Sequence, residues 1–170
     1  MMMHNKKQPE TLKGYTKGQF ENRPWGFYEV LKTGTENNQE FCEKKIGVKP
    51  FQALSLQRHH YRREYWEVLS GELTVIHKGE VMTLKESETI NIELFAPHCM
   101  INMTDKPVVV YEKQTGLCRE EDNDRLYDFS GRQTLEIAVD DHAAHKSKLE
   151  YLRITDFLHA VTNGSKDKAA

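Results

Sequence analysis

The chain has 170 residues, of which 38% are hydrophobic and 29% are charged, and its formal net charge is -2. This length suits one well-buried domain, and the near balance of charges disfavours a nucleic-acid-binding surface. Apolar runs are far shorter than the roughly 20 residues needed to cross a bilayer, so we expect no membrane role. The cysteines, Cys42, Cys99 and Cys118, are widely spaced, which favours reduced structural thiols and a cytoplasmic protein.

Residues 1–19 are polar and lack the apolar core of a signal peptide, so we expect a flexible leader there. From Trp25 to Gln114 the chain breaks into short extended runs separated by turn residues such as Gly71 and Gly79. No part of this region keeps a helical period, so the pattern predicts an antiparallel double-sheet barrel of the jelly-roll type. The predicted strands are residues 25–31, 40–48, 53–59, 64–70, 72–78, 80–85, 88–93, 98–103 and 107–114.

After Gln114 the sequence changes character. A charged connector over residues 120–125 precedes a tail in which Ser147 and Glu150 have the spacing of a capping box. One or two short helices are expected in this tail. The predicted organisation is therefore a flexible leader (1–19), a barrel domain (20–134) and a partly helical C-terminal extension (135–170).

Strand alternation predicts a polar cluster inside the barrel. Gln57 and His59 are two residues apart and share a face. Glu64 shares a face with Trp66 and Val68, and His98 shares one with Met100 and Asn102. Two imidazoles, a carboxylate and an amide oxygen suit a divalent ion such as Zn²⁺, Mn²⁺, Fe²⁺, Co²⁺ or Ni²⁺. Hydrogen-bonded polar histidines without a metal fit the same spacing, so the residues alone leave both interpretations open.

Small motifs in a fixed order extend this pattern. They are Arg23-Pro-Trp-Gly26, Leu54-Ser-Leu-Gln57, His59-His60, Arg62, Glu64, Trp66, Ser70-Gly71, Glu86-Ser87, His98-x-x-x-Asn102, Glu112, Gln114, Gly116, Glu121-Asp122, Arg125, Asp128 and Gly131-Arg132. Together they resemble the cupin domain of type II phosphomannose isomerases, over roughly Phe20 to Arg132. The resemblance implies an all-β cupin double-stranded β-helix. In that family the cupin often follows a guanylyltransferase domain, whereas we expect a stand-alone isomerase here.

The resemblance also implies a chemistry. The family interconverts mannose 6-phosphate and fructose 6-phosphate, so we expect this reaction, or that of a close hexose phosphate, through an enediol. One divalent ion per chain is expected, held by Gln57, His59, Glu64 and His98. Glu112, which shares inward parity with Gln114, is the expected base, with orientation of a metal ligand as the alternative role.

A sugar phosphate also needs cationic side chains at the barrel mouth. The residues assigned to substrate binding are Lys44, Lys45, Arg62, Gln114, Arg125 and Arg132. Of these, Arg62 and Arg125 are assigned to catalysis as well.

Departures from the family pattern lie close to this site. Phe51 stands at a glycine position, Tyr61 and Tyr65 stand at histidine positions, and Glu93-Leu94-Phe95 replaces a Pro-x-Gly turn. They keep open a second interpretation, a divergent cupin that binds a sugar phosphate or sugar nucleotide without turnover. A 3,5-epimerase or an iron dioxygenase is disfavoured, because the first would use a His/Tyr dyad and the second an all-histidine or facial-triad site.

Apolar side chains also lie on the predicted outer faces. Leu54 and Leu56 are opposite the ligand positions, and Val109 and Tyr111 are opposite Glu112. Contiguous apolar surface of this kind is seldom left exposed to water. Cupins commonly pair through such faces, so the resemblance implies a two-fold homodimer. The alternative is that the N-terminal segment around Phe20 to Trp25 and the C-terminal helices cover the face locally.

Overall fold

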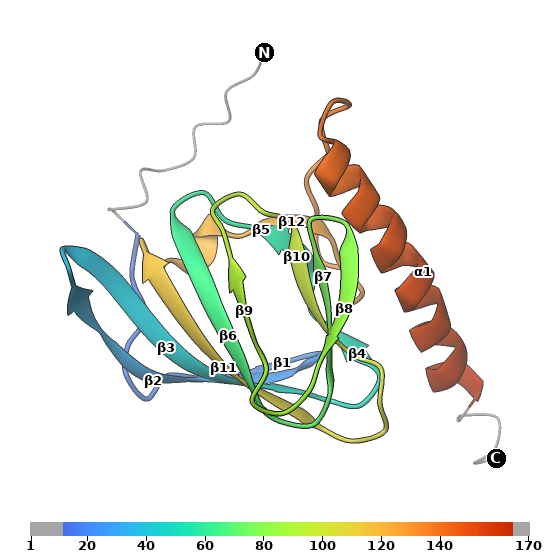
Figure 1. Ribbon diagram of the computed structural model, residues 1–170, viewed down its shortest axis with the longest axis horizontal. Coiled ribbons are helices and arrows are strands. Elements are labelled where there is room, and N and C mark those ends of the chain that lie inside the picture. The colour runs from blue at the N-terminus through green and yellow to red at the C-terminus, as the bar shows by residue number, and fades with distance from the viewer. Residues whose placement is uncertain (1–11, 165–170) are drawn as a thin grey trace.

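A computed structural model describes residues 12–164, and in this part of the chain two six-stranded antiparallel sheets face each other (Figure 1). The first sheet contains, in spatial order, β1 (Phe20–Arg23), β2 (Gly26–Glu36), β3 (Gln39–Val48), β11 (Val108–Gly116), β6 (Arg62–Ser70) and β9 (Thr89–Ile92). The second contains β12 (Asp124–Tyr127), β5 (Leu56–Arg58), β10 (His98–Asn102), β7 (Leu73–His77) and β8 (Glu80–Leu84), with β4 (Gln52–Ala53) paired to β10. The predicted all-β cupin double-stranded β-helix is confirmed.

Two strands were not predicted. β1 pairs antiparallel with β2, with Phe20 opposite Glu29, and β12 pairs with β5, with Asp124 opposite Arg58. Both are short and rich in charged residues, so neither has the apolar alternation of a strand. Their conformation depends on partner strands that are distant in the sequence.

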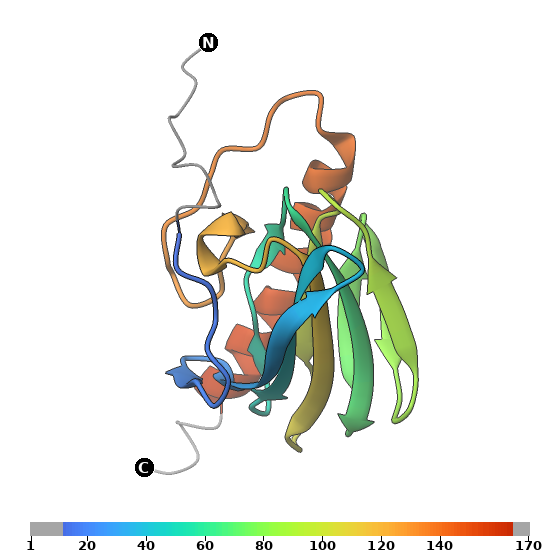
Figure 2. The same ribbon diagram turned by 90° about the vertical axis from the view of Figure 1, so that its left-hand side faces the viewer.

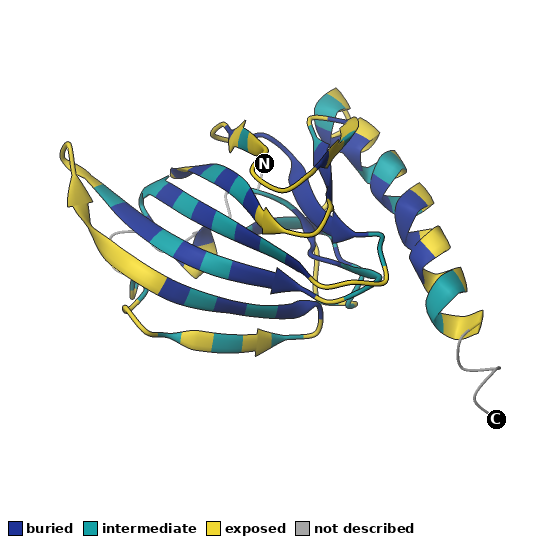
Figure 3. Ribbon diagram, turned by 60° about the horizontal axis from the view of Figure 1, so that its bottom comes forward, coloured by how far each residue is buried: buried dark blue, intermediate teal, exposed yellow. Residues whose placement is uncertain are grey.

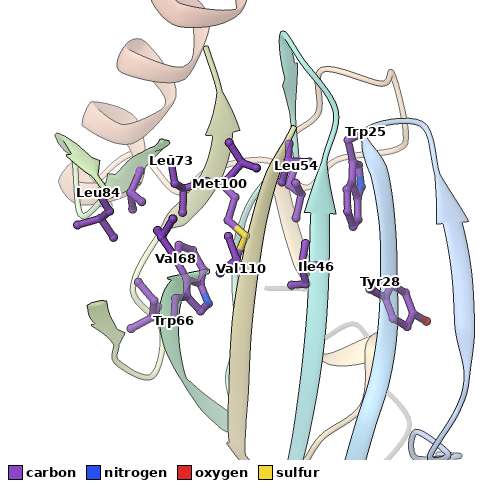
Figure 4. Packing of buried hydrophobic residues seen from close by; sticks show 14 of the residues in the cluster. Trp25, Tyr28, Ile46, Leu54, Trp66, Val68, Leu73, Leu84, Met100 and Val110 are labelled. Atoms are coloured by element: carbon purple, nitrogen blue, oxygen red, sulfur yellow. The ribbon is translucent and has the colours of Figure 1, made fainter. Parts of the chain in front are cut away.

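The interior between the sheets follows strand alternation. Buried and partly exposed positions alternate along the central strands (Figure 3). Trp66, Val68, Met100 and Val110 point into the space between the sheets (Figure 4). Leu54 packs there too, contrary to the prediction, because residues 54 and 55 interrupt the strand between β4 and β5 and the alternation shifts. The inner face of the barrel is therefore largely set by the period-two pattern.

An α-helix, α1 (His142–Gly164), covers the outer face of the second sheet (Figure 1). Its buried side chains, which include Tyr151 and Leu158, pack against residues such as Leu56 and Ile101. The expectation of one or two short helices is wrong, because this apolar face supports a helix of 23 residues. The local-cover alternative therefore holds for this sheet.

The predicted capping box is also wrong. Ser147 is buried inside the helix, and Asp141 caps the N-terminus instead, with its Oδ1 accepting a hydrogen bond of 3.0 Å from the amide of Ala144. Asp141 also forms an ion pair with Arg58 at the end of β5. One carboxylate thus begins the helix and ties it to the second sheet.

The second part of the predicted leader lies against the barrel. Val30 donates a backbone hydrogen bond of 2.8 Å to Gln19, and Tyr15 packs edge-on against Tyr28 with 6.2 Å between ring centroids. Figure 2 shows this segment beside the orange turn η2 (Glu120–Asp122). The expectation of a flexible leader needs correction for residues 12–19, because these contacts hold them, while residues 1–11 lie outside the described range. No helix in the described residues is long and apolar enough to cross a membrane.

Candidate metal centre and substrate pocket

Three of the four predicted metal ligands converge inside the barrel. His59 follows β5, Glu64 lies on β6 and His98 lies on β10, and their ligand atoms are all within 4.8 Å of one another. The three residues are 2%, 3% and 1% exposed, respectively. His59 Nε2 is 3.0 Å from one Glu64 oxygen, and His98 Nε2 is 3.6 Å from the other. The two sheets thus supply donors to one buried point.

Backbone carbonyls orient both imidazole rings. A carbonyl oxygen only accepts, so His59 Nδ1 donates to Asp122 O at 2.9 Å and His98 Nδ1 donates to Ala96 O at 2.8 Å. Each Nε2 therefore points toward Glu64, and the neutral ring of His98 carries a lone pair there. His98 Nε2 is buried without a hydrogen-bond partner among the described residues. This donor set fits a divalent cation, because the orientation of the rings and the unused lone pair are those of a metal site.

The charge states of these residues agree with that fit. Burial lowers the pKa of His98 to about 4, so the ring is neutral at physiological pH. Burial alone would raise the pKa of Glu64, but His59, Arg62 and His98 together bring it well below its usual range. Glu64 also accepts a hydrogen bond of 3.0 Å from the indole of Trp66. The centre therefore combines neutral imidazole with an ionised, well-held carboxylate.

Gln57 lies next to this group. It is opposite His98 in the pairing of β5 with β10, and it lines the adjoining pocket. Its Oε1 accepts a hydrogen bond of 3.1 Å from Ser55. The role of Gln57 as the fourth ligand stays a prediction.

Arg62 is not at the barrel mouth, where a phosphate anchor was expected. It is 4% exposed, and its Nε donates to Glu64 at 3.1 Å while Nη1 donates to the carbonyl of Arg119 at 2.6 Å. Its Nη2 lies 3.2 Å from His59 Nε2. The expected position is wrong because Arg62 shares the inward parity of Glu64 and Trp66, which placed it inside with the carboxylate.

The two candidate lysines lie on opposite faces of β3. Lys44 is buried in the pocket, with Nζ 3.5 Å from the ring centroid of Tyr15 and 4.6 Å from that of Tyr28. Burial lowers the pKa of Lys44. Lys45 faces outward and pairs with Glu29 at 3.2 Å, so its assignment to substrate binding is wrong. Alternation permits only one of two consecutive strand residues to face the interior.

Glu112 lies directly across from Lys44 in the pairing of β11 with β3. Burial and the nearby charge of Glu64 raise the pKa of Glu112 to about 8. Gln114 Nε2 donates to Glu112 at 3.0 Å, and Gln114 Oε1 is buried without a partner among the described residues. A carboxyl group with a pKa near neutrality is suited to transfer a proton in either direction.

The mouth of the pocket carries three arginines. Arg132 is held by two hydrogen bonds of 2.8 and 3.1 Å to Asp128, and Arg23 is held by Glu120 at 2.6 Å. Burial and the neighbouring charge of Arg132 lower the pKa of Arg125, whose Nε has no partner among the described residues. Such a group of guanidinium ions favours an anionic ligand.

Sequence reasoning assigned no role to several of the pocket residues, and Arg23 and Tyr15 are two of them. Arg23 stands in a motif that was recognised, but no role was assigned to it. Tyr15 gave no signal, because it is a single aromatic residue in a polar segment. Both reach the pocket through the packing of residues 12–23 on the barrel.

The departures from the family pattern lie outside the pocket in the described part of the chain. Phe51 and Phe95 have φ of 54° and 63°, so each takes the left-handed conformation expected of the glycine it replaces, at a cost of about 1–2 kcal/mol. Tyr61 is exposed, and Tyr65 packs against Tyr111 on the outer face of the first sheet. Phe51 also packs against the apolar cluster under α1, and none of these departures changes the pocket lining.

Relatives with known names match most of the barrel. The chain is 41% identical over 101 residues to "Mannose-1-phosphate guanylyltransferase ManC" of Salmonella typhimurium, covering 59% of this chain and 20% of that protein. It is 40% identical over 111 residues to "Xanthan biosynthesis protein XanB" of Xanthomonas campestris, covering 65% and 23%. It is 37% identical over 113 residues to "Alginate biosynthesis protein AlgA" of Pseudomonas fluorescens, covering 66% and 23%. The chain thus spans only about a fifth of the length of these relatives.

Solved structures support the fold. The oxalate decarboxylase of Lactobacillus farciminis matches with a TM-score of 0.53 and 13% identity, covering 64% of this chain and 33% of that one. KdgF from a Halomonas species matches with a TM-score of 0.51 and 10% identity, covering 58% and 87%. The family model described as "Mannose-6-phosphate isomerase C-terminal" matches residues 12–128, which is more than half of the chain and includes every pocket residue except Arg132. The chain therefore belongs to the mannose-6-phosphate isomerase C-terminal family.

Proposed function

We propose that this protein is a metal-dependent aldose–ketose isomerase that interconverts mannose 6-phosphate, or a close hexose phosphate, and the corresponding ketose phosphate. One observation carries the proposal: Glu112, a carboxyl group with a pKa of about 8, lines a pocket that adjoins the His-Glu-His donor set. Arg62 lines the same pocket and contacts both Glu64 and His59 of that set. Isomerisation through an enediol needs one group that both removes and returns a proton. The family model, described as "Mannose-6-phosphate isomerase C-terminal", supports this chemistry.

The metal would supply electrophilic chemistry. One divalent ion per chain, held by His59, Glu64 and His98 with Gln57 as the predicted fourth ligand, would act as a Lewis acid toward the carbonyl and hydroxyl oxygens of the sugar. The ion would be Zn²⁺, Mn²⁺, Fe²⁺, Co²⁺ or Ni²⁺, since mixed nitrogen and oxygen donors suit all five.

The protein's own residues handle the proton. In this proposal Glu112 removes the proton from C2 of the aldose and returns it to C1, while a second proton moves between the two oxygens. Gln114 Nε2 orients the Glu112 carboxyl group through their 3.0 Å hydrogen bond. Lys44 places a positive charge opposite Glu112, where it stabilises negative charge on the enediol oxygens. Arg62 holds Glu64 in place.

The arginine-lined mouth binds the phosphate group in this proposal. Arg125 has an unpartnered buried Nε among the described residues, and Arg132 is fixed by Asp128, so the pair is arranged to take phosphate oxygens. Arg23 adds a third guanidinium at the rim. A substrate anchored there would extend its carbon chain toward Glu112.

The test is proton exchange. Metal-reconstituted protein is incubated with a panel of hexose 6-phosphates in D₂O, and exchange at C2 and formation of the ketose are followed by NMR. We expect both with mannose 6-phosphate and neither with the unphosphorylated sugar. Saturable binding of sugar phosphates with no exchange under any of the five metals would contradict the isomerase and support the alternative, a binding cupin without turnover.

We also propose a two-fold homodimer that pairs through the outer face of the first sheet. Phe27, Gly47 and Val109 lie side by side across β2, β3 and β11 on this face, and Phe20 stacks on Phe27 with 5.3 Å between centroids. A Cβ at Gly47 would lie 2.2 Å from the Phe27 ring, so the glycine permits this apolar row. An apolar row on one face suits an isologous interface.

A further inference from the structure

Asp122, at the end of η2, makes three contacts with the segment that carries His59. The residue is 4% exposed. Its Oδ1 accepts a hydrogen bond of 3.0 Å from the amide of His60, and its Oδ2 accepts one of 2.9 Å from the amide of Tyr61. Its backbone carbonyl accepts the 2.9 Å bond from His59 Nδ1. A single residue thus holds both the main chain and the ring at a metal-ligand position.

The segment it holds connects two ligand-bearing strands. β5 ends at Arg58 and β6 begins at Arg62, so residues 59–61 form the whole connection. The carbonyl of His59 accepts from Phe95 N at 2.7 Å, and the carbonyl of Tyr61 accepts from Leu117 N at 2.9 Å. Asp122 binds the amides of the second and third residues, and the connection determines how His59 faces Glu64.

The chemistry of these contacts calls for a carboxylate. Two consecutive amide groups donate toward one side chain, and an ionised aspartate offers two oxygens that only accept. An asparagine of the same shape would turn an NH₂ group toward one of these donors and leave that amide unsatisfied. Asp122→Asn is therefore a disruptive substitution despite its small change in volume.

We propose that Asp122 is a positioning residue for the metal centre, which directs His59 Nε2 toward Glu64 and His98 by holding residues 59–61 and by fixing the His59 tautomer. The inference rests on the metal centre of the proposed function and is independent of the isomerase reaction. Partners that orient a ligating histidine contribute roughly 10- to 100-fold to metal affinity. Asp122 acts in this way both through its carbonyl and through its carboxylate.

The test is a metal titration of matched variants. Co²⁺ is titrated into metal-free wild type, Asp122→Asn, Asp128→Asn and Glu121→Gln by calorimetry, and the unfolding temperature of each metal-free protein is measured. Asp128 is a second buried carboxylate. Its Oδ2 accepts a hydrogen bond of 2.7 Å from the amide of Arg132, which is not part of the metal centre. Glu121 is the exposed neighbour on the same turn. Asp122→Asn is expected to bind Co²⁺ roughly 10- to 100-fold more weakly, and the two controls to keep wild-type affinity.

Wild-type Co²⁺ affinity in Asp122→Asn would overturn the proposal. An equal loss of Co²⁺ affinity in Asp122→Asn and Asp128→Asn would also overturn it, because it would indicate a general effect of losing a buried carboxylate. If Asp122→Asn does not fold, ¹⁵N shifts of the wild-type, metal-free imidazoles decide instead. His59 protonated at Nδ1 supports the proposal, and His59 protonated at Nε2 overturns it. Co²⁺ binding to a wild type that shows no C2 exchange would contradict only the isomerase.

Discussion

The two sheets differ in what they place on their inner faces and in what covers their outer faces. The first sheet supplies the ionisable groups Lys44, Glu64 and Glu112, whereas the second supplies the neutral side chains of His98 and Gln57. The second sheet also carries Arg125, on its edge strand β12. Helix α1 covers the outside of the second sheet, while the first keeps the row around Phe27 and Val109 partly exposed. The groups proposed for proton transfer and the proposed dimer surface therefore belong to one sheet, and the helix covers the other.

The largest expected effect is on turnover, through the first sheet. Glu112→Gln removes the proposed base but keeps the shape of the side chain. We expect C2 exchange to fall by roughly 10²- to 10⁴-fold while metal content stays at the wild-type level. Exchange rates and metal analysis on the same preparation check this. A near-normal rate would move the role of base to another group, with Lys44 or water next.

The matching substitution on the second sheet should act through the metal. His98→Ala removes a neutral donor, so we expect metal content to fall well below one ion per chain, and His59→Ala to behave in the same way. Metal analysis after dialysis gives the result. Equal metal content in wild type and the double variant would contradict the centre as described.

The helix can be tested through its contact with the second sheet. Leu158 is fully buried in the cluster under α1, whereas Leu149 on the same helix is 70% exposed. Leu158→Ala should lower the free energy of unfolding by about 2–5 kcal/mol, because it leaves a cavity. Leu149→Ala should change it by less than about 0.5 kcal/mol. Denaturant titration compares them, and equal effects would show that the helix does not pack as described.

A smaller effect is expected where the helix begins. Asp141→Ala removes both the cap and the ion pair with Arg58 and should cost about 1 kcal/mol, while Asp141→Asn keeps a capping side chain and loses only the charge. Burial opposes ionisation of Asp141, but Arg58 outweighs it, so the folded pKa lies below the usual value of about 3.9. The charge therefore stabilises the fold above that pH, and the stabilisation is lost as the pH falls through the lower folded pKa. A wild-type advantage over Asp141→Asn that did not shrink in acid would contradict this assignment.

The proposed homodimer can be tested without changing any residue of the pocket. Light scattering at micromolar concentration should give a mass near twice the 19.8 kDa of one chain. Val109→Lys, on the outer face of β11, should shift the mass toward one chain because it puts a charge into the apolar row. A wild-type mass near 19.8 kDa would contradict the dimer and leave the outer face of the first sheet exposed.

Much of the site was open to prediction because strand alternation is a local property. The same parity that places Glu64 inside also places Arg62 inside, and the parity of Ile46 selects Lys44 over Lys45. Strand parity was therefore readable from the sequence for both residues. The prediction placed Arg62 at the barrel mouth and Lys45 in the substrate site, and both positions disagree with that parity. Leu54 could not be placed in this way, because an interruption between β4 and β5 shifts the alternation.

By itself, the sequence determined the barrel, the family and the types of residue at the metal centre, because period-two alternation and short motifs depend on neighbouring residues. Only the tertiary structure decided the contacts between distant segments: Tyr15 over Lys44, Asp122 on the segment after β5, and α1 on the second sheet. It also decided the pKa of Glu112. That value depends on burial and on the charge of Glu64 on a neighbouring strand, and neither can be read from local sequence.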